Sequence, residues 1–298
     1  MSDMPACPLC EGSDKEVLFT CTDFLVSGED FSVVKCRQCG LIRTEAPPPE
    51  NKIGSYYQSE DYISHSDSKK GFTEILYHLA RNFMLKRKSS LISQVSGLET
   101  GFLLDIGSGT GYFPAFMAKK GWKVKGIEIN EQARNFSVSK FGLHILSPDN
   151  ESQLNNSAFD VVTLWHVMEH LNDLTHWFGV INRVLRNDGV CVIALPNADS
   201  SDAERFGKYW AAYDVPRHLW HFSPVTFRSL AEKNGFRVIK MKGMPLDVFY
   251  ISILSYRHMK RNLPFIRGII TGMVLSFKNL FGKNRSSSMI YVLKKQAV

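Results

Sequence analysis

The residues best suited to chemistry in this 298-residue chain form a glycine-rich turn after an apolar strand. Asp105 lies near the end of the strand, and three glycines follow at alternate positions: Gly107, Gly109 and Gly111. Glycines there allow the backbone to turn tightly and to approach a ligand closely. The Asp105 carboxylate would repel a pyrophosphate, but it suits a cationic amino-acid ligand. Glu128 ends the next strand, where an acid can accept hydrogen bonds from both hydroxyls of a ribose.

Around this turn, apolar runs with strand character alternate with segments of helical periodicity. The expected strands are 102–106, 123–129, 143–146, 160–165, 190–195, 236–241 and 289–293, and the expected helices are 72–95, 112–120, 131–141, 171–186 and 224–234. Strands that alternate with helices are typical of a parallel sheet covered on both faces. The sequence therefore predicts an α/β fold with a doubly wound, Rossmann-like, mostly parallel seven-stranded sheet.

With these motifs the chain resembles the class I S-adenosyl-L-methionine (SAM)-dependent methyltransferases over about residues 72–245 and 287–298. The resemblance implies an enzyme in which Asp105 and the glycine turn hold the methionine part of SAM. It implies that Glu128 binds the ribose and that the loop 147–149 flanks the adenine. It also implies that Trp165 and His166, just past the fourth strand, line the SAM pocket.

A cluster of ionisable residues follows that fourth strand. His166, Glu169 and His170 are spaced so that they share one face of a helical turn. Some quinone and RNA-terminus methyltransferases place magnesium on a similar turn, which begins with an acid. In this chain His166 replaces that acid, and imidazole is a poorer magnesium ligand. We therefore expect a structural or capping role for Glu169 and His170, with a metal as the alternative.

The segment 206–223 leaves the carboxyl edge of the predicted sheet, where open α/β sheets bind ligands. It resembles a stretch found in methyltransferases of bacterial glycan and secondary-metabolite pathways. Its Arg217 is a candidate acceptor contact. His218 and His221 are candidate general bases, because imidazole titrates near neutral pH. The alternative is that both histidines only pack and hydrogen-bond the loop, since positioning alone can accelerate methyl transfer.

Four of the six cysteines form two C-x-x-C pairs near the N-terminus: Cys7, Cys10, Cys36 and Cys39. Two such pairs suit a tetrahedral zinc ion, and a module of about 44 residues needs such a staple. The sequence thus predicts a structural zinc site, with iron or no metal as alternatives. Several small-molecule methyltransferases, including sugar methyltransferases, begin with a similar module followed by a tyrosine-rich segment. By that resemblance, Tyr56, Tyr57 and Tyr62 are possible acceptor contacts; otherwise they are linker tyrosines.

These features divide the chain into a zinc-binding module (1–44), a linker or substrate lid (45–71) and a methyltransferase domain (72–298). The domain carries a helical insertion at 246–286 before its last strand. From Lys240 onward the chain has eleven basic residues and one acid, Asp247, although the whole chain has a net charge of only +7. Such a basic, apolar insertion can lie on a membrane. We favour a lid or an oligomer contact instead, because Pro264, Gly268 and Gly272 interrupt the helical pattern.

The sequence favours a small-molecule acceptor, with a sugar or glycan intermediate as the first hypothesis. The alternatives are a membrane-associated methyltransferase of a quinone or lipid, and a nucleic-acid-binding protein with a vestigial SAM fold. Residues 1–44 carry too few basic side chains for nucleic-acid binding to be expected. The N-terminus lacks the apolar segment of a secretory signal, so we expect a cytoplasmic protein, with contact at the inner face of the membrane as an alternative. The oligomeric state is not predicted.

Overall fold

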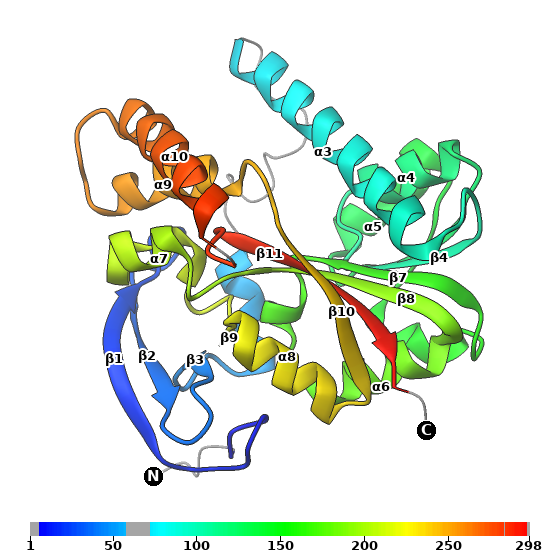
Figure 1. Ribbon diagram of the computed structural model, residues 1–298, viewed down its shortest axis with the longest axis horizontal. Helices are drawn as coiled ribbons and strands as arrows, with labels where there is room; N and C mark the ends of the chain where they lie inside the picture. The colour runs from blue at the N-terminus through cyan, green and yellow to red at the C-terminus, as the bar shows by residue number, and fades with distance from the viewer. Residues whose placement is uncertain (1–5, 58–71, 283, 297–298) are drawn as a thin grey trace.

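The computed structural model of the protein describes residues 6–57, 72–282 and 284–296. Its larger sheet has seven strands in the order β10-β11-β8-β7-β4-β5-β6 (Figure 1). The strands are β4 (Phe102–Ile106), β5 (Lys123–Ile127), β6 (His144–Leu146), β7 (Phe159–Trp165), β8 (Leu185–Pro196), β10 (Phe236–Gly243) and β11 (Ser288–Lys295). Only β11 runs antiparallel to its neighbours. This confirms the doubly wound, mostly parallel fold.

Helices cover both faces of this sheet because successive strand residues point to opposite sides. On one face Leu104 and Val162 pack with Phe178 of α6 (Leu174–Val184) and with α8 (Pro224–Lys233). On the other face Leu103 and Val161 pack with α3 (Phe72–Ser96) and α4 (Tyr112–Lys119). A further helix, α5 (Glu131–Phe141), connects β5 to β6. The alternation of apolar residues therefore builds one sheet with two cores.

One expected helix begins later than its sequence pattern indicates. Residues 171–186 are predicted as a helix, but α6 begins only at Leu174, where the Asp173 side chain accepts a hydrogen bond from the His176 backbone N–H. The preceding Met168–His170 forms a short 3₁₀ turn, η3. His166, between β7 and that turn, has a left-handed backbone with φ of +58°. The left-handed residue prevents a helix from continuing through this segment, and α6 begins only after its N-cap at Asp173.

A second, four-stranded sheet lies beside the large one (Figure 1), in the order β1-β2-β3-β9. Its strands are β1 (Lys15–Thr22), β2 (Asp30–Cys36), β3 (Ile42–Thr44) and β9 (Trp220–His221). The first three come from the N-terminal segment, whereas β9 comes from the loop between β8 and α8. After β3 the chain forms α1 (Glu50–Ile53) and the 3₁₀ turn η1 (Gly54–Tyr57). The N-terminal module and the methyltransferase domain thus share a sheet.

The segment between β10 and β11 is helical, as expected, and consists of α9 (Asp247–His258) and α10 (Pro264–Phe281). After β8 the chain forms a short helix, α7 (Ser201–Phe206), and two 3₁₀ turns, η4 (Gly207–Tyr209) and η5 (Ala211–Tyr213). None of the helices in the described ranges is both long and apolar enough to cross a bilayer.

Two glycines bring α9 and α10 into close contact. A Cβ added to Gly268 would lie 2.7 Å from the Cα of Ile253, and one added to Gly272 would overlap the ring of Phe249. Because interiors are close-packed, neither position has room for a side chain. Both glycines therefore lie on the face of α10 that meets α9.

A matched pair of substitutions tests this packing. Gly179→Ala, in helix α6 with no atom within 4 Å of the added Cβ, should raise the unfolding free energy by about 0.5–1 kcal/mol, because alanine favours helix. Gly268→Ala makes the same chemical change but should lower the unfolding free energy by about 1–3 kcal/mol through overpacking. Chemical denaturation of both variants gives the comparison. Stabilisation by Gly268→Ala would contradict the close contact between the two helices.

Candidate active site

The glycine turn has the geometry of a ligand cradle. Gly107, Gly109 and Gly111 all have left-handed backbones, with φ of +71°, +52° and +79°. A Cβ at Gly107 would collide with Val167, and one at Gly111 would collide with Ser137. A Cβ at Gly109 would meet nothing within 4 Å. The middle glycine therefore faces open space, where a ligand can approach the backbone.

Glu128 closes this cradle from the neighbouring strand. One carboxylate oxygen accepts a hydrogen bond from the Gly109 N–H (2.7 Å), and the other accepts from the Asn130 N–H (2.9 Å). The residue is buried at the carboxyl end of β5. The structure thus brings the two predicted parts of the SAM site together, and we propose that they bind the methionine and ribose parts as the resemblance implies.

The carboxyl group of Asp105, just before the glycine turn, is buried near the charge of Lys88. Burial raises the pKa of its carboxyl to about 7, although the Thr163 hydroxyl, which donates a hydrogen bond (2.5 Å), and the charge of Lys88 oppose this shift. Burial also lowers the pKa of Lys88 to about 8. Lys88 comes from α3, and its Nζ lies 4.2 Å from the ring centroid of Trp165. Sequence reasoning missed this lysine, because nothing in a helical pattern shows which polar residue turns toward the sheet.

His166 is held between two carboxylates. Its Nδ1 lies 3.4 Å from Glu169 Oε1, and its Nε2 lies 3.3 Å from Asp247 Oδ2. Burial alone would lower the pKa of His166, but Asp247 and Glu169 outweigh it and raise the pKa to about 9. The imidazolium form therefore persists at neutral pH. We propose that His166 orders the edge of the SAM pocket as a cation.

Glu169, His170 and His218 form a compact centre beside the glycine turn. One potential donor atom from each residue lies within 4.8 Å of the others, and the two imidazole rings meet edge to face at 4.5 Å. His170 Nδ1 lies 3.0 Å from the Arg217 carbonyl oxygen, and His218 Nδ1 lies 2.8 Å from the Ala212 carbonyl oxygen. Because a carbonyl oxygen can only accept, each Nδ1 carries the proton and each Nε2 keeps its lone pair.

The carboxylate of this centre is paired with a cation but has no hydrogen bond. Glu169 is fully buried and its Oε1 forms an ion pair with His166 Nδ1 (3.4 Å), but neither oxygen makes a hydrogen bond among the described residues. Burial would raise the pKa of Glu169, but His166 and the other nearby histidines outweigh it and hold the pKa below its usual value. The ion pair is compatible with the structural role expected for Glu169, while no capping hydrogen bond is present among the described residues. An ionised carboxylate close to two imidazole rings can also stabilise an incoming proton or hold a divalent cation.

The other predicted site residues lie in different surroundings. His221 Nε2 hydrogen-bonds the Thr44 hydroxyl (3.2 Å), and burial lowers its pKa to about 3, so its position favours packing between β9 and β3. Tyr57 reaches the centre, with its hydroxyl 3.0 Å from His170 Nδ1. Tyr56 instead turns outward to hydrogen-bond Glu29. Tyr62 lies outside the described residues.

Arg217 does not face an acceptor site. It is 1% exposed, and its guanidinium donates to Asp23 (2.9 Å), to both oxygens of Asp214 (2.6 and 3.0 Å) and to the Tyr56 carbonyl oxygen (2.9 Å). These bonds use four of the five N–H donors of a guanidinium that is almost fully buried. We therefore propose a structural role for Arg217 in place of the expected acceptor contact.

Comparison with known proteins decides the family. A model of the methyltransferase domain matches residues 79–241, which is more than half of the chain. The chain belongs to this methyltransferase family. It is a class I SAM-dependent methyltransferase, so the hypothesis of a nucleic-acid-binding protein with a vestigial fold is not supported.

Relatives and solved structures agree with this assignment. The ubiquinone biosynthesis O-methyltransferase of Paramagnetospirillum magneticum is 30% identical over 57% of this chain and 71% of its own length. Two solved structures share the fold. Phosphoethanolamine N-methyltransferase 2 of Haemonchus contortus, with SAM, has a TM-score of 0.50, 18% identity and coverage of 71% and 53% of the two chains. Burkholderia thailandensis 1,6-didemethyltoxoflavin-N1-methyltransferase, with S-adenosylhomocysteine, has a TM-score of 0.50, 14% identity and coverage of 88% and 97%.

The four N-terminal cysteines gather as the sequence pattern predicts. The sulfur atoms of Cys7 and Cys39 lie 3.5 Å apart, as do those of Cys10 and Cys36, and all four are free thiols. Zn–S bonds of about 2.3 Å in a tetrahedron would place the sulfur atoms about 3.8 Å apart. The donor set and its spacing fit, and we propose that it holds one structural zinc ion.

Elemental analysis tests the zinc proposal. About one zinc per chain is expected, and Cys36→Ser should lose the metal and melt the small sheet, because metal binding contributes folding free energy. Cys21→Ser removes another buried cysteine outside the cluster and should keep the zinc. The proposal would be contradicted if wild-type protein contained no zinc and had the same thermal midpoint as Cys36→Ser.

A second matched pair tests the SAM cradle. Gly109 and Gly142 both have left-handed backbones, and neither added Cβ would meet an atom within 4 Å. Backbone strain should therefore be similar in Gly109→Ala and Gly142→Ala. Only Gly109→Ala should weaken SAM binding, by about tenfold or more, because its methyl group occupies ligand space. Calorimetric titration that finds equal affinities for the two variants would refute the assignment.

Proposed function

We propose that the protein transfers the methyl group of SAM to the hydroxyl oxygen of an apolar, ring-bearing acceptor of the quinol type. The observation that supports this function is the centre of Glu169, His170 and His218, which follows directly after Val167, the residue that packs against Gly107 of the SAM cradle. The relative that acts as a ubiquinone biosynthesis O-methyltransferase supports this acceptor class. The sugar acceptor, our first hypothesis from sequence, has no such support.

The chemistry of the centre favours a phenolic hydroxyl. A phenol has a pKa of about 10, so it gives up its proton to imidazole far more readily than an aliphatic sugar hydroxyl does. His218 Nε2 would accept that proton as the oxygen attacks the methyl group in line. The buried Glu169 carboxylate would stabilise the imidazolium that forms, because charge interactions are strong where water is excluded. We propose His218, rather than His221, as the general base.

The segment that follows the small sheet supports a covering role over the acceptor. Tyr57 lies in η1 and contacts His170, and the Tyr56 carbonyl oxygen is fixed by Arg217. We propose that residues 45–57 form part of the wall around the acceptor. Such an acceptor partitions into lipid, so the proposal also places the enzyme at a membrane surface.

A variant at the base tests this function. His218→Gln should lower kcat with a catechol probe by about 100-fold or more, because a positioned base contributes about 10²–10⁴ to the rate. SAM affinity should stay unchanged, since the SAM cradle is intact. His176→Gln, an exposed histidine on α6, is the matched control and should keep wild-type turnover. Equal single-turnover rates for both variants would remove His218 from the mechanism.

The same three side chains favour a second candidate, a divalent cation at the centre. The observation is that a Glu169 oxygen without a hydrogen bond and one ring nitrogen each of His170 and His218 lie within 4.8 Å of one another, a donor set that suits transition-metal ions. A bound cation would lower the pKa of the acceptor hydroxyl. Turnover that is lost in a chelator and restored by a metal salt would favour this candidate. Unchanged turnover in the chelator would favour His218 as the base.

A further inference from the structure

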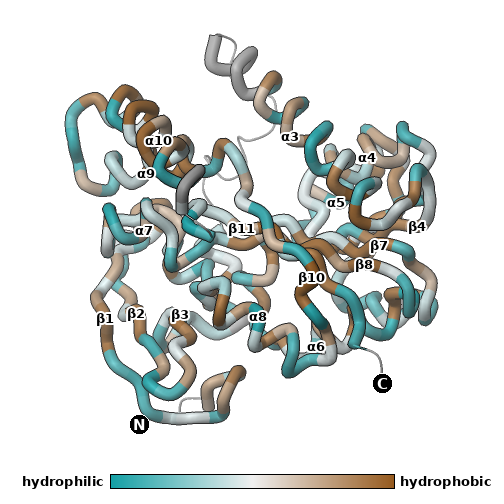
Figure 2. Tube along the Cα trace, viewed as in Figure 1, coloured by the Kyte–Doolittle hydropathy of each residue, from teal (hydrophilic) through white to brown (hydrophobic). Residues whose placement is uncertain are grey.

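Helix α10 exposes an apolar face that the fold leaves uncovered. Its exposed apolar residues, each more than half exposed, are Phe265, Ile266, Ile270, Met273, Val274 and Phe277. Their spacing places them along one side of the helix, opposite the buried Gly268 and Leu275. Figure 2 shows the apolar colouring of α10 at the outer edge of the molecule. This side is too large and continuous to be a chance exposure of single side chains.

The proline and glycines of α10 do not interrupt this apolar face. Gly268 and Gly272 point toward α9, where they allow the two helices to approach. Pro264 is the first residue of the helix, where its missing N–H and fixed φ are tolerated. The reason to favour a lid or oligomer contact over a membrane contact therefore disappears.

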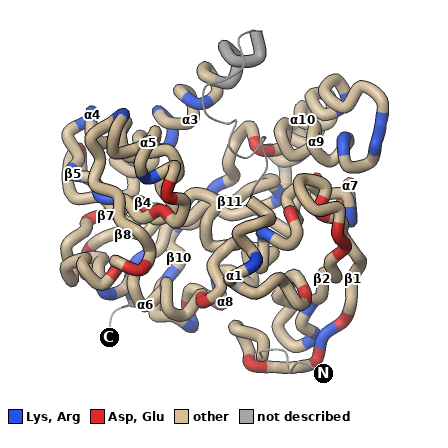
Figure 3. The backbone as a smooth tube through the Cα atoms, turned by 180° about the vertical axis from the view of Figure 1, so that it is seen from behind, with Lys and Arg blue, Asp and Glu red and all other residues tan. Residues whose placement is uncertain are grey.

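The helical pair after Asp247 carries charge of a single sign. No acidic residue follows Asp247 in the chain. The exposed basic residues of the helical pair are Arg257, Lys260, Arg261, Arg267 and Lys278. Figure 3 shows positive charge at the turn between α9 and α10, and Lys278 lies toward the other end of α10. The apolar face is thus flanked by cations at both ends, which complements an anionic surface.

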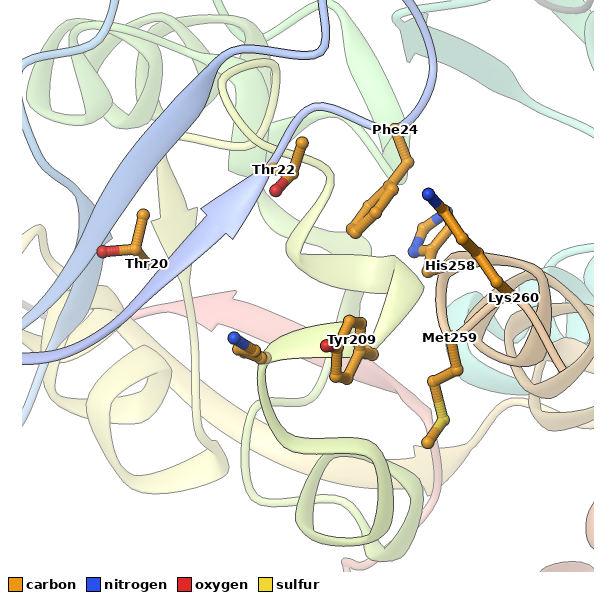
Figure 4. A pocket seen from close by; sticks show the side chains of 8 residues that line it. Thr20, Thr22, Phe24, Tyr209, His258, Met259 and Lys260 are labelled. Carbon is orange, nitrogen blue, oxygen red and sulfur yellow. The ribbon is translucent and has the colours of Figure 1, made fainter.

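A cleft beside the tip of the helical pair continues this positive character. It encloses about 320 Å³ between β1, η4 and the end of α9 (Figure 4). Lys208 and Lys260 both line it, together with the hydroxyls of Thr20 and Thr22 and the ring of Phe24, and no acidic side chain does. The Thr22 hydroxyl already donates to Asp30 (2.6 Å), so the ammonium groups of Lys208 and Lys260 and the Thr20 hydroxyl are the groups that suit the phosphate of a lipid headgroup.

We propose that the exposed face of α10 docks on an anionic lipid bilayer, with the apolar side chains in the interface and the basic residues on the headgroups. The proposal extends the proposed function, because it names the surface from which an apolar acceptor would be drawn. A second copy of the chain is a poorer occupant, since two uniformly basic faces repel each other. The helix would lie in the interface rather than span it.

Vesicle sedimentation of the 298-residue chain tests the proposal. Ile270→Glu with Val274→Glu places two carboxylates in the middle of the face. Val138→Glu with Val225→Glu adds the same charge at exposed valines on α5 and α8, and serves as the matched control. Wild type and control should bind phosphatidylglycerol vesicles at low salt and lose binding as salt rises. The Ile270/Val274 variant should bind at least about tenfold more weakly, while thermal unfolding and SAM affinity stay unchanged in both variants.

Several results would overturn the docking surface. These are wild-type protein that ignores phosphatidylglycerol vesicles, equal binding to phosphatidylcholine vesicles at all salt concentrations, and equal loss of binding in both double variants. A dimer that dissociates in the Ile270/Val274 variant without any vesicle binding would assign the face to a second copy. Because vesicle binding needs no turnover, failure of the proposed acceptor chemistry would leave this measurement intact.

Discussion

The buried guanidinium of Arg217 is the interaction on which the rest of the site depends. A buried charge costs several kcal/mol unless it is paired and hydrogen-bonded. Here Asp23 comes from the end of the small sheet, Asp214 from the same loop as Arg217, and the Tyr56 carbonyl from the segment after β3. Three segments distant in sequence must therefore meet at one point, because each supplies part of the compensation.

This constraint reaches the reactive centre through the backbone. The carbonyl oxygen of Arg217 fixes the tautomer of His170, and the Thr44 hydroxyl donates to the carbonyl oxygen of His218 (2.6 Å). Strand β3 thus holds the loop that carries the proposed base. The N-terminal module thus supplies the sheet edge, β3, on which β9 and the loop before it are built.

Sequence patterns predicted the parts of the protein that local rules determine. The glycine turn, Glu128 and the alternating strands follow from backbone freedom and from periodicity, and the structure places them as expected. The pairing of Arg217 with Asp23 spans 194 residues, so no local pattern reports it. Arg217 was predicted as an acceptor contact because its segment leaves the ligand-binding edge of the sheet; arginine is rarely buried, and its two carboxylate partners explain the exception. The late start of α6 accompanies the left-handed backbone of His166, which a helical periodicity does not indicate.

Glycine in α10 shows how one residue type supports opposite conclusions. From sequence, Gly268 and Gly272 read as weak points of an interfacial helix, because glycine lowers helix stability in isolation. In the structure they let α9 and α10 approach, and this contact makes up for the lost propensity. Because the small residues occupy the inner face together with Leu275, most of the large apolar residues of α10 lie outward. The exposed face of α10 is therefore a consequence of the packing, and its uniform basic flanks are a separate property of the sequence. Their coincidence on one helix is what distinguishes a lipid-facing surface from an incompletely buried core.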